Sequence, residues 1–176
     1  MKTICILSNG PSVDKFDISQ RMDFYTIIGV NKTVEKWACD WWCFCDYKTI
    51  NEVTPLGSPV LFTKHIAMQK FEKRSPDRYN LFDTNIFIGH EDIVPPDLPD
   101  DAPPWNAFSG CAALGLAYHL KAEQVIVYGA DMAGDSDCKG DIGLSRDDSR
   151  WKHERRIWDM LVMSLYAQGV GVRRVI

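Results

Sequence analysis

Short, continuous apolar runs that end at small or polar residues most constrain how this chain can fold. The first four runs are Lys2–Ser8, Tyr25–Val30, Trp41–Cys45 and Val60–Thr63, and turn-like and short helical segments follow the first three. Strands that are buried on both faces of a parallel sheet have this continuous apolar character. Because strands and helices alternate along the chain, the sequence predicts an α/β fold with a mostly parallel sheet flanked by helices.

The second half of the chain continues this alternation. We expect strands at Gln124–Tyr128 and Gly171–Ile176 and helices at Ser109–His119 and Arg150–Gln168. One or two further short strands are expected within Asn80–Ile88. Serine at the start of a helix can accept a main-chain N–H, so we expect Ser12 to cap a short helix over Val13–Ile18 and Ser109 to cap the helix that it opens. Glu91–Pro104 holds five acidic residues, five prolines and no Lys or Arg, which predicts an extended loop or lid over 90–105.

Length, charge and cysteine usage exclude several classes of protein. With 176 residues, 45% of them hydrophobic, the chain fits a single packed domain over 1–176. The net charge of −4 argues against a protein that coats nucleic acid. No apolar run approaches the ~20 residues of a membrane-spanning helix. The first apolar run reads as a strand and not as an export signal, and most cysteines lie in apolar stretches, so we expect reduced core thiols and a cytoplasmic protein.

Polar residues follow several of the predicted strands. They are Asn9–Ser12, Asn31, Asp46 and Gly129–Asp131. In an open α/β sheet, ligands bind at the carboxyl ends of the strands, so these residues are candidates for one site. Gly10 would let a ligand approach the main chain, although a purely structural turn is an equal interpretation. The sequence contains neither a Gly-x-Gly-x-x-Gly fingerprint nor a phosphate loop, so dinucleotide binding is not implied. The spacing of Cys39, Cys43 and Cys45 matches no common zinc pattern, so no metal site is predicted.

His153 is a candidate general base. It lies near the start of the last predicted helix, among cations that include Arg146 and Arg150. At 100° per residue it points away from the apolar stripe of that helix, and neighbouring positive charges favour the neutral imidazole. A neutral imidazole can accept a proton, but a surface histidine on a basic helix is the competing interpretation.

Five segments together resemble a known family. Ile6–Ser12 resembles the Gly-Asn-Gly-Pro-Ser opening of the bacterial sialyltransferases of glycosyltransferase family forty-two, and Val30–Asn31 is similar to its second nucleotide-site asparagine. Phe108–Gly110 and Val125–Asp131 resemble its Thr-Ser-Gly and strand-Gly-x-Asp elements, and His153 precedes a long helix as its catalytic histidine does. The related flagellin-modifying glycosyltransferases share the Gly-Pro-Ser and Gly-x-Asp elements. The resemblance covers about 1–50 and 105–176, and the compact length is similar to that of phage-encoded relatives.

The resemblance implies a modified Rossmann-like, nucleotide-binding domain. Its donor would be CMP-sialic acid or a related CMP-nonulosonic acid, transferred with inversion to a glycan or other hydroxyl acceptor, with no required cofactor or metal. His153 would deprotonate the acceptor, and relatives are often oligomers. The residues implied to hold the nucleotide are Asn9, Gly10, Pro11, Ser12, Asn31, Asp46, Ser109, Gly110 and Asp131.

Three departures from the family pattern keep two other functions open. No tyrosine follows Asp131, Asn106 stands where the family has arginine, and Asp46 stands where it has asparagine. We therefore expect Arg146 or Arg150 to stabilise the leaving group. One alternative is a magnesium-dependent diphosphotransferase, because a pterin pyrophosphokinase family also shares the Gly-Pro-Ser and Gly-x-Asp elements, and this resemblance implies Asp46 and Asp131 as magnesium ligands. The other is a phage protein that binds a nucleotide without catalysis.

Overall fold

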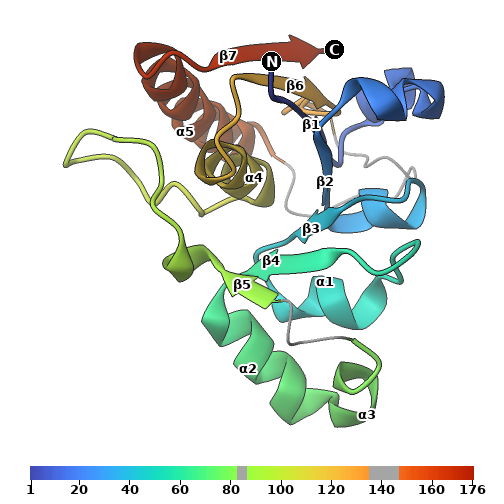
Figure 1. Cartoon of the computed structure of the whole chain (residues 1–176). Helices are drawn as coiled ribbons and strands as arrows, with labels where there is room; N and C mark the ends of the chain where they lie inside the picture. The colour runs from blue at the N-terminus through green and yellow to red at the C-terminus, as the bar shows by residue number, and fades with distance from the viewer. Residues whose placement is uncertain (83–86, 135–146) are drawn as a thin grey trace.

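One parallel sheet organises the molecule in the computed structural model, which describes residues 1–82, 87–134 and 147–176 (Figure 1). The strand order is β5-β4-β3-β2-β1-β6-β7, and every pair of neighbours is parallel. The strands are β1 (Thr3–Leu7), β2 (Thr26–Val30), β3 (Trp41–Cys43), β4 (Val60–Thr63), β5 (Phe87–Gly89), β6 (Gln124–Tyr128) and β7 (Gly171–Val175). This confirms the predicted α/β fold with a mostly parallel sheet.

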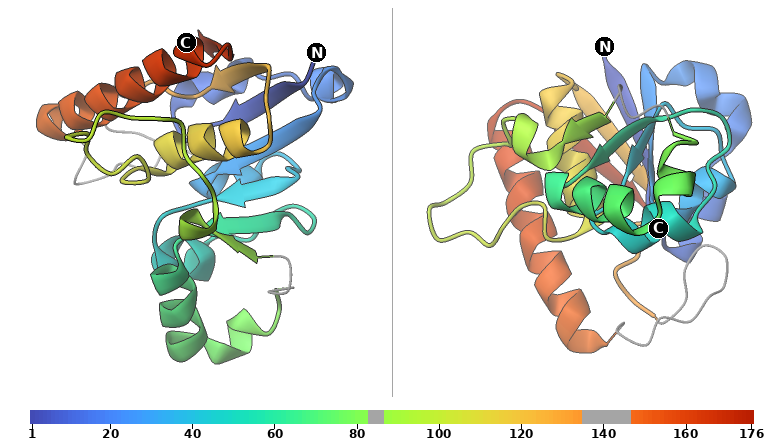
Figure 2. Two further views of the ribbon diagram at one scale, coloured as in Figure 1. Left: turned by 60° about the vertical axis from the view of Figure 1, so that its left-hand side comes forward. Right: turned by 90° about the horizontal axis from the view of Figure 1, so that it is seen from below.

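Helices cover both faces of the sheet (Figure 2). One face carries α4 (Ser109–His119) and α5 (Asp148–Ala167). The other carries shorter elements, namely the 3-10 helices η1 (Pro11–Lys15), η2 (Ile18–Asp23) and η3 (Asn31–Glu35) and the α-helices α1 (Tyr47–Glu52), α2 (His65–Arg74) and α3 (Pro76–Tyr79). The 3-10 helix η5 (His90–Asp92) follows β5.

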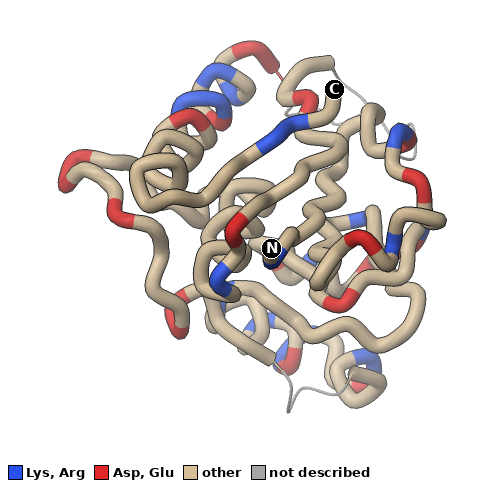
Figure 3. Tube along the Cα trace, turned by 45° about the horizontal axis from the view of Figure 1, so that its top comes forward, with Lys and Arg blue, Asp and Glu red and all other residues tan. Residues whose placement is uncertain are grey.

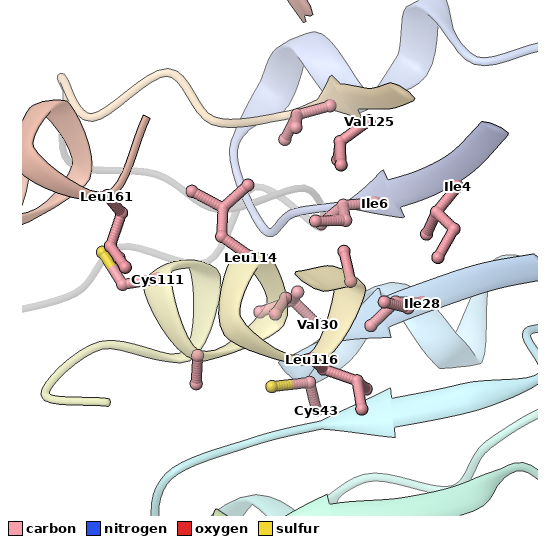
Figure 4. Packing of buried hydrophobic residues seen from close by; sticks show 14 of the residues in the cluster. Ile4, Ile6, Ile28, Val30, Cys43, Cys111, Leu114, Leu116, Val125 and Leu161 are labelled. Atoms are coloured by element: carbon pink, nitrogen blue, oxygen red, sulfur yellow. The ribbon is translucent and has the colours of Figure 1, made fainter. Parts of the chain in front are cut away.

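Alternation along each strand divides the core into two layers. Ile4 and Ile6 of β1 face α4, whereas Cys5 and Leu7 face the opposite layer. Figure 4 shows the first layer, in which Leu114 of α4 lies among the side chains of neighbouring strands. The two buried layers explain why the strand sequences are continuously apolar. Small residues in α4 let this helix pack closely on the sheet, and residues 110–117 are all buried.

The predicted helix caps at Ser12 and Ser109 are wrong. The helix expected over Val13–Ile18 is instead η1, and its N-cap is Gly10, without a side-chain capping bond. The Ser12 N–H donates to Asp131 Oδ2 at 3.0 Å, so Ser12 lies inside the turn and is not the cap. Ser109 is the first residue of α4 and does not cap it, because the N-cap position belongs to Phe108.

The middle of the chain contains two helices that the sequence analysis did not identify, α2 and α3. Within the part of Asn80–Ile88 that is described, one strand begins, β5. Residues 93–108 then run without regular structure, and the main-chain carbonyl of Asp97 holds this segment to α5 by accepting a hydrogen bond from Ser164 Oγ. Figure 3 shows acidic residues along this loop and basic residues on α5 and β7. The lid function of 90–105 stays a prediction.

The described cysteines are free thiols, as expected for core residues. Cys5, Cys39, Cys43 and Cys111 are buried. Burial raises the pKa of Cys39 to about 12, which keeps its thiol neutral. No helix in the described ranges is both long enough and apolar enough to cross a membrane.

His90 gives the fold a testable pH dependence. Its ring is 1% exposed and packs between Phe62 and Trp105, with centroid distances of 4.4 and 5.9 Å. Burial, aided by the positive charge of Lys64, lowers the pKa of His90 from 6.5 to about 4. Since the unfolded chain takes up a proton below pH 6.5 and the native state does not, this contribution to stability is complete above pH 6.5. It is lost as the pH falls toward 4.

We therefore expect the free energy of unfolding to fall by about 3 kcal/mol more in the wild type than in His90→Phe between pH 7 and pH 4. Urea unfolding of both proteins at several pH values measures this difference. Because the wild type and the variant share the other three histidines, the difference between their stability curves reports the titration of His90. Parallel stability curves for the two proteins would contradict the assignment.

Candidate functional site

A cavity of about 420 Å³ lies at the carboxyl ends of β1, β2, β3 and β6. The chain builds the sheet from β1 in one direction to β5 and then in the other direction through β6 and β7. The carboxyl ends of β1 and β6 therefore form a topological switch point, where open α/β sheets bind ligands. Most of the residues that the resemblance implies for nucleotide binding line this cavity, namely Asn9, Gly10, Asn31, Asp46, Ser109, Gly110 and Asp131.

The turns after β1 and β6 interlock and form part of the cavity wall. The Gly10 N–H donates to the Gly129 carbonyl at 2.8 Å, and the Ser12 N–H donates to Asp131 Oδ2. A Cβ on Gly10 would lie 2.1 Å from Asp131 Oδ2, and one on Gly129 would lie 2.4 Å from the Ser8 carbonyl oxygen. Both positions therefore require glycine, and Gly129 also has a φ of +75°.

Asn31 and Asp46 enter the cavity from β2 and β3. Asn31 has a φ of +52°, a left-handed conformation that asparagine tolerates better than most residues, and its carbonyl accepts a hydrogen bond from Trp42 Nε1 at 2.9 Å. Asp46 is the N-cap of α1 and its Oδ1 accepts from the Lys48 and Thr49 N–H groups at 3.0 and 3.3 Å. Both residues are thus fixed by their local structure.

Pro11 and Ser12 are not among the lining residues. Pro11 is exposed at the start of η1. The Ser12 hydroxyl donates to the Val175 carbonyl at 3.4 Å, while its N–H holds Asp131. The structure therefore brings Asn9 and Gly10 of this motif to the cavity and uses Ser12 to fix the carboxylate beside them.

Helix α5 presents one face to the cavity. Its lining residues are Arg150, Trp151, Glu154 and Trp158. At 100° per residue these side chains fall within an arc of about 100°, and His153 lies about 60° outside it. His153 is exposed and is not among the lining residues. Its ring packs edge-on against the lining residue Phe108, with the centroids 5.7 Å apart.

Of the two arginines predicted to stabilise the leaving group, Arg150 lies within the described residues. The Arg150 guanidinium lies 5.7 Å from the centroid of the Phe108 ring and lines the cavity. Arg146 lies outside the described residues. Three lining residues carry carboxylates, namely Asp46, Asp131 and Glu154. No three His, Cys, Asp or Glu side chains gather as metal ligands in the part of the chain that the structure describes.

Further lining residues that were not predicted from the sequence bear on the chemistry of the cavity. Ser8 closes β1, and Glu154 follows Arg150 by four residues on α5. That four-residue spacing on one helix was the available signal for Glu154. Cys45 lines the cavity as a neutral thiol, because burial raises its pKa.

Comparisons with known proteins identify the fold. No protein-family model and no curated protein matches the sequence. Among solved structures, the chain is similar to the sialyltransferase CstII from Campylobacter jejuni in complex with a substrate analogue, CMP-3FNeuAc. The TM-score is 0.56 over 99% of this chain and 81% of that chain, with 12% sequence identity. This chain shares its fold with a sialyltransferase. At this identity the likeness concerns the fold alone.

The interlocked turns generate a prediction for Gly10→Ala. The new methyl group would overlap the Asp131 carboxylate, so we expect the variant to lose about 2 kcal/mol of stability, as overpacked sites do. Gly171→Ala is the matched control, because its Cβ would have no neighbour closer than 3.9 Å. Urea unfolding compares both variants with the wild type, and a Gly10→Ala protein as stable as the control would contradict this account.

Proposed function

We propose that this chain is a glycosyltransferase that uses a nucleotide-activated sugar, with CMP-sialic acid or a related CMP-nonulosonic acid as the donor. The observation that carries the proposal is the cavity at the switch point, which gathers Asn9, Gly10, Asn31, Ser109 and Gly110 from three separate segments. The fold shared with a sialyltransferase supports the choice of donor.

The proposed reaction is an inverting transfer to a hydroxyl acceptor. The acceptor oxygen attacks the anomeric carbon as the bond to the donor phosphate breaks, and the phosphate keeps the electron pair. Arg150 lines the cavity and would stabilise the charge that develops on this phosphate. His153 would take the proton of the acceptor hydroxyl. This assignment brings the acceptor to the side of the cavity where Phe108 packs against the His153 ring.

Nucleotide binding is the first test of this proposal. A thermal-shift panel of CMP, CDP, CTP, UDP, GDP and ATP, with and without magnesium, compares the wild type with Asn9→Ala. A ligand at about 100 Kd stabilises the fold by about 2.7 kcal/mol, so a specific nucleotide gives a clear shift. We expect selective stabilisation by cytidine nucleotides that is lost in Asn9→Ala and kept in Asn80→Ala, which alters the exposed C-cap residue that follows α3.

Other outcomes of the panel favour the alternatives. Stabilisation by ATP that requires magnesium would favour the diphosphotransferase. Cytidine binding without release of CMP from any sugar donor would favour a nucleotide-binding protein without catalysis. No shift with any nucleotide would contradict the proposed function and leave the fold unchanged.

Catalysis is tested with His153→Ala and Arg150→Ala. A general base contributes roughly 100-fold to 10,000-fold in rate, so His153→Ala should lose at least 100-fold in the release of CMP from CMP-sialic acid while its donor affinity stays the same. Arg150→Ala should weaken both donor binding and turnover, because it removes a cation from the cavity. His119→Ala, at the far end of α4, is the control. Full turnover by His153→Ala would overturn its role as base.

A further inference from the structure

Two polar side chains converge on a point of the cavity that no side chain fills. Gly110 lies in the first turn of α4, and a Cβ on it would lie 3.4 Å from Ser8 Oγ and 4.0 Å from Glu154 Oε1. Ser8 comes from the end of β1 and Glu154 from the cavity face of α5, and all three residues line the cavity. Three elements therefore surround one small space beside Gly110.

The Glu154 carboxylate faces inward at this point. It lies within the arc of α5 that lines the cavity, one turn after Arg150 and one turn before Trp158. Burial raises the pKa of the Cys45 and Cys111 thiols, and the negative charge of Glu154 raises both pKa values further. The Glu154 carboxylate therefore lies beside Gly110 on the cavity side of α5.

The chemistry of the two side chains selects the ligand group that can bind between them. An ionised carboxylate only accepts hydrogen bonds, whereas a serine hydroxyl both donates and accepts. A ligand hydroxyl can donate to Glu154 and accept from Ser8 at the same time. A phosphodiester or a carboxylate has no proton to donate at neutral pH, and the negative charge of Glu154 repels either group.

We propose that Ser8, Gly110 and Glu154 form a hydroxyl-binding subsite of the cavity. It takes a hydroxyl of the nucleotide ribose or of a bound sugar, and it directs the anionic groups of the ligand toward Arg150. The inference rests on the proposed function for the identity of the ligand, but its geometry is independent of the reaction.

Gly110→Ala tests the subsite directly. The new methyl group would occupy the space beside Ser8 at ordinary van der Waals distance, and alanine favours a helix more than glycine does, so the variant should fold. Glu154→Gln removes the charge and keeps the size of the side chain. Gly171→Ala makes the same glycine-to-alanine change on β7, away from the cavity.

Calorimetry with CMP, 2′,3′-dideoxy-CMP and CMP-sialic acid distinguishes the two sources of the hydroxyl. If the ribose binds, the wild type and Gly171→Ala should prefer CMP to the dideoxy analogue by about tenfold, which corresponds to one hydrogen bond. Gly110→Ala should lose this preference, and Glu154→Gln should reduce it, because the glutamine amide oxygen accepts a hydroxyl more weakly than a carboxylate does. If a sugar binds, CMP and its analogue should bind alike, and Gly110→Ala should lose affinity for CMP-sialic acid only. Unchanged binding of all three ligands by Gly110→Ala would overturn the proposal.

A titration with D-ribose separates this inference from the proposed function. If the wild type binds no nucleotide, the proposed function fails. The subsite is then tested by following the amide NMR signal of Gly110 as D-ribose is added. A shift of that signal with D-ribose that is absent in Glu154→Gln supports a hydroxyl subsite. The absence of any shift in the wild type overturns it.

Discussion

The interlock between the turns after β1 and β6 fixes the cavity, and the rest of the site depends on it. The parallel register of the two strands continues past their ends, as Ser8 donates to the Tyr128 carbonyl and Gly10 to the Gly129 carbonyl. Ser12 then holds Asp131 across a separation of 119 positions. Each of these bonds has a main-chain N–H as its donor, and Gly10 and Gly129 leave no room for a Cβ, so the wall of the cavity is organised before a ligand arrives.

The sequence predicted the parts of the fold that local pattern determines. The cores of β1, β2, β4 and β6 are continuous apolar runs bounded by turn residues, and the helix over Ser109–His119 has the predicted bounds. A parallel sheet brings the carboxyl ends of its strands to one edge, so the polar residues after four strands meet without any further information. The predicted caps failed because a serine side chain is only one of several possible partners, and the tertiary contact of Ser12 with Asp131 decided that turn.

Adjacent residues on α5 show what the sequence could not determine. His153 and Glu154 differ by about 100° around the helix axis, so the rotation of α5 about its axis decides which of them faces the cavity. That rotation is fixed by the burial of Ile157, Trp158 and Leu161 against α4 and the sheet. The apolar stripe could be read from the sequence, but the direction of the cavity relative to the stripe depends on where β1 and β6 end.

The charged residues of the cavity have two roles, because some hold the local structure and others face the ligand in the proposed complex. Asp46 and Asp131 each accept main-chain N–H groups, so these carboxylates hold the turns that shape the site. Arg150 and Glu154 have opposite charge and stand one turn apart on the same face of α5. In the proposed complex this pair distinguishes the two ends of a nucleotide sugar, because a phosphate is attracted to the guanidinium and a hydroxyl can donate to the carboxylate. One helix face would therefore set the orientation of the donor in the cavity, and the rotation that turns Glu154 inward places His153 against Phe108 instead.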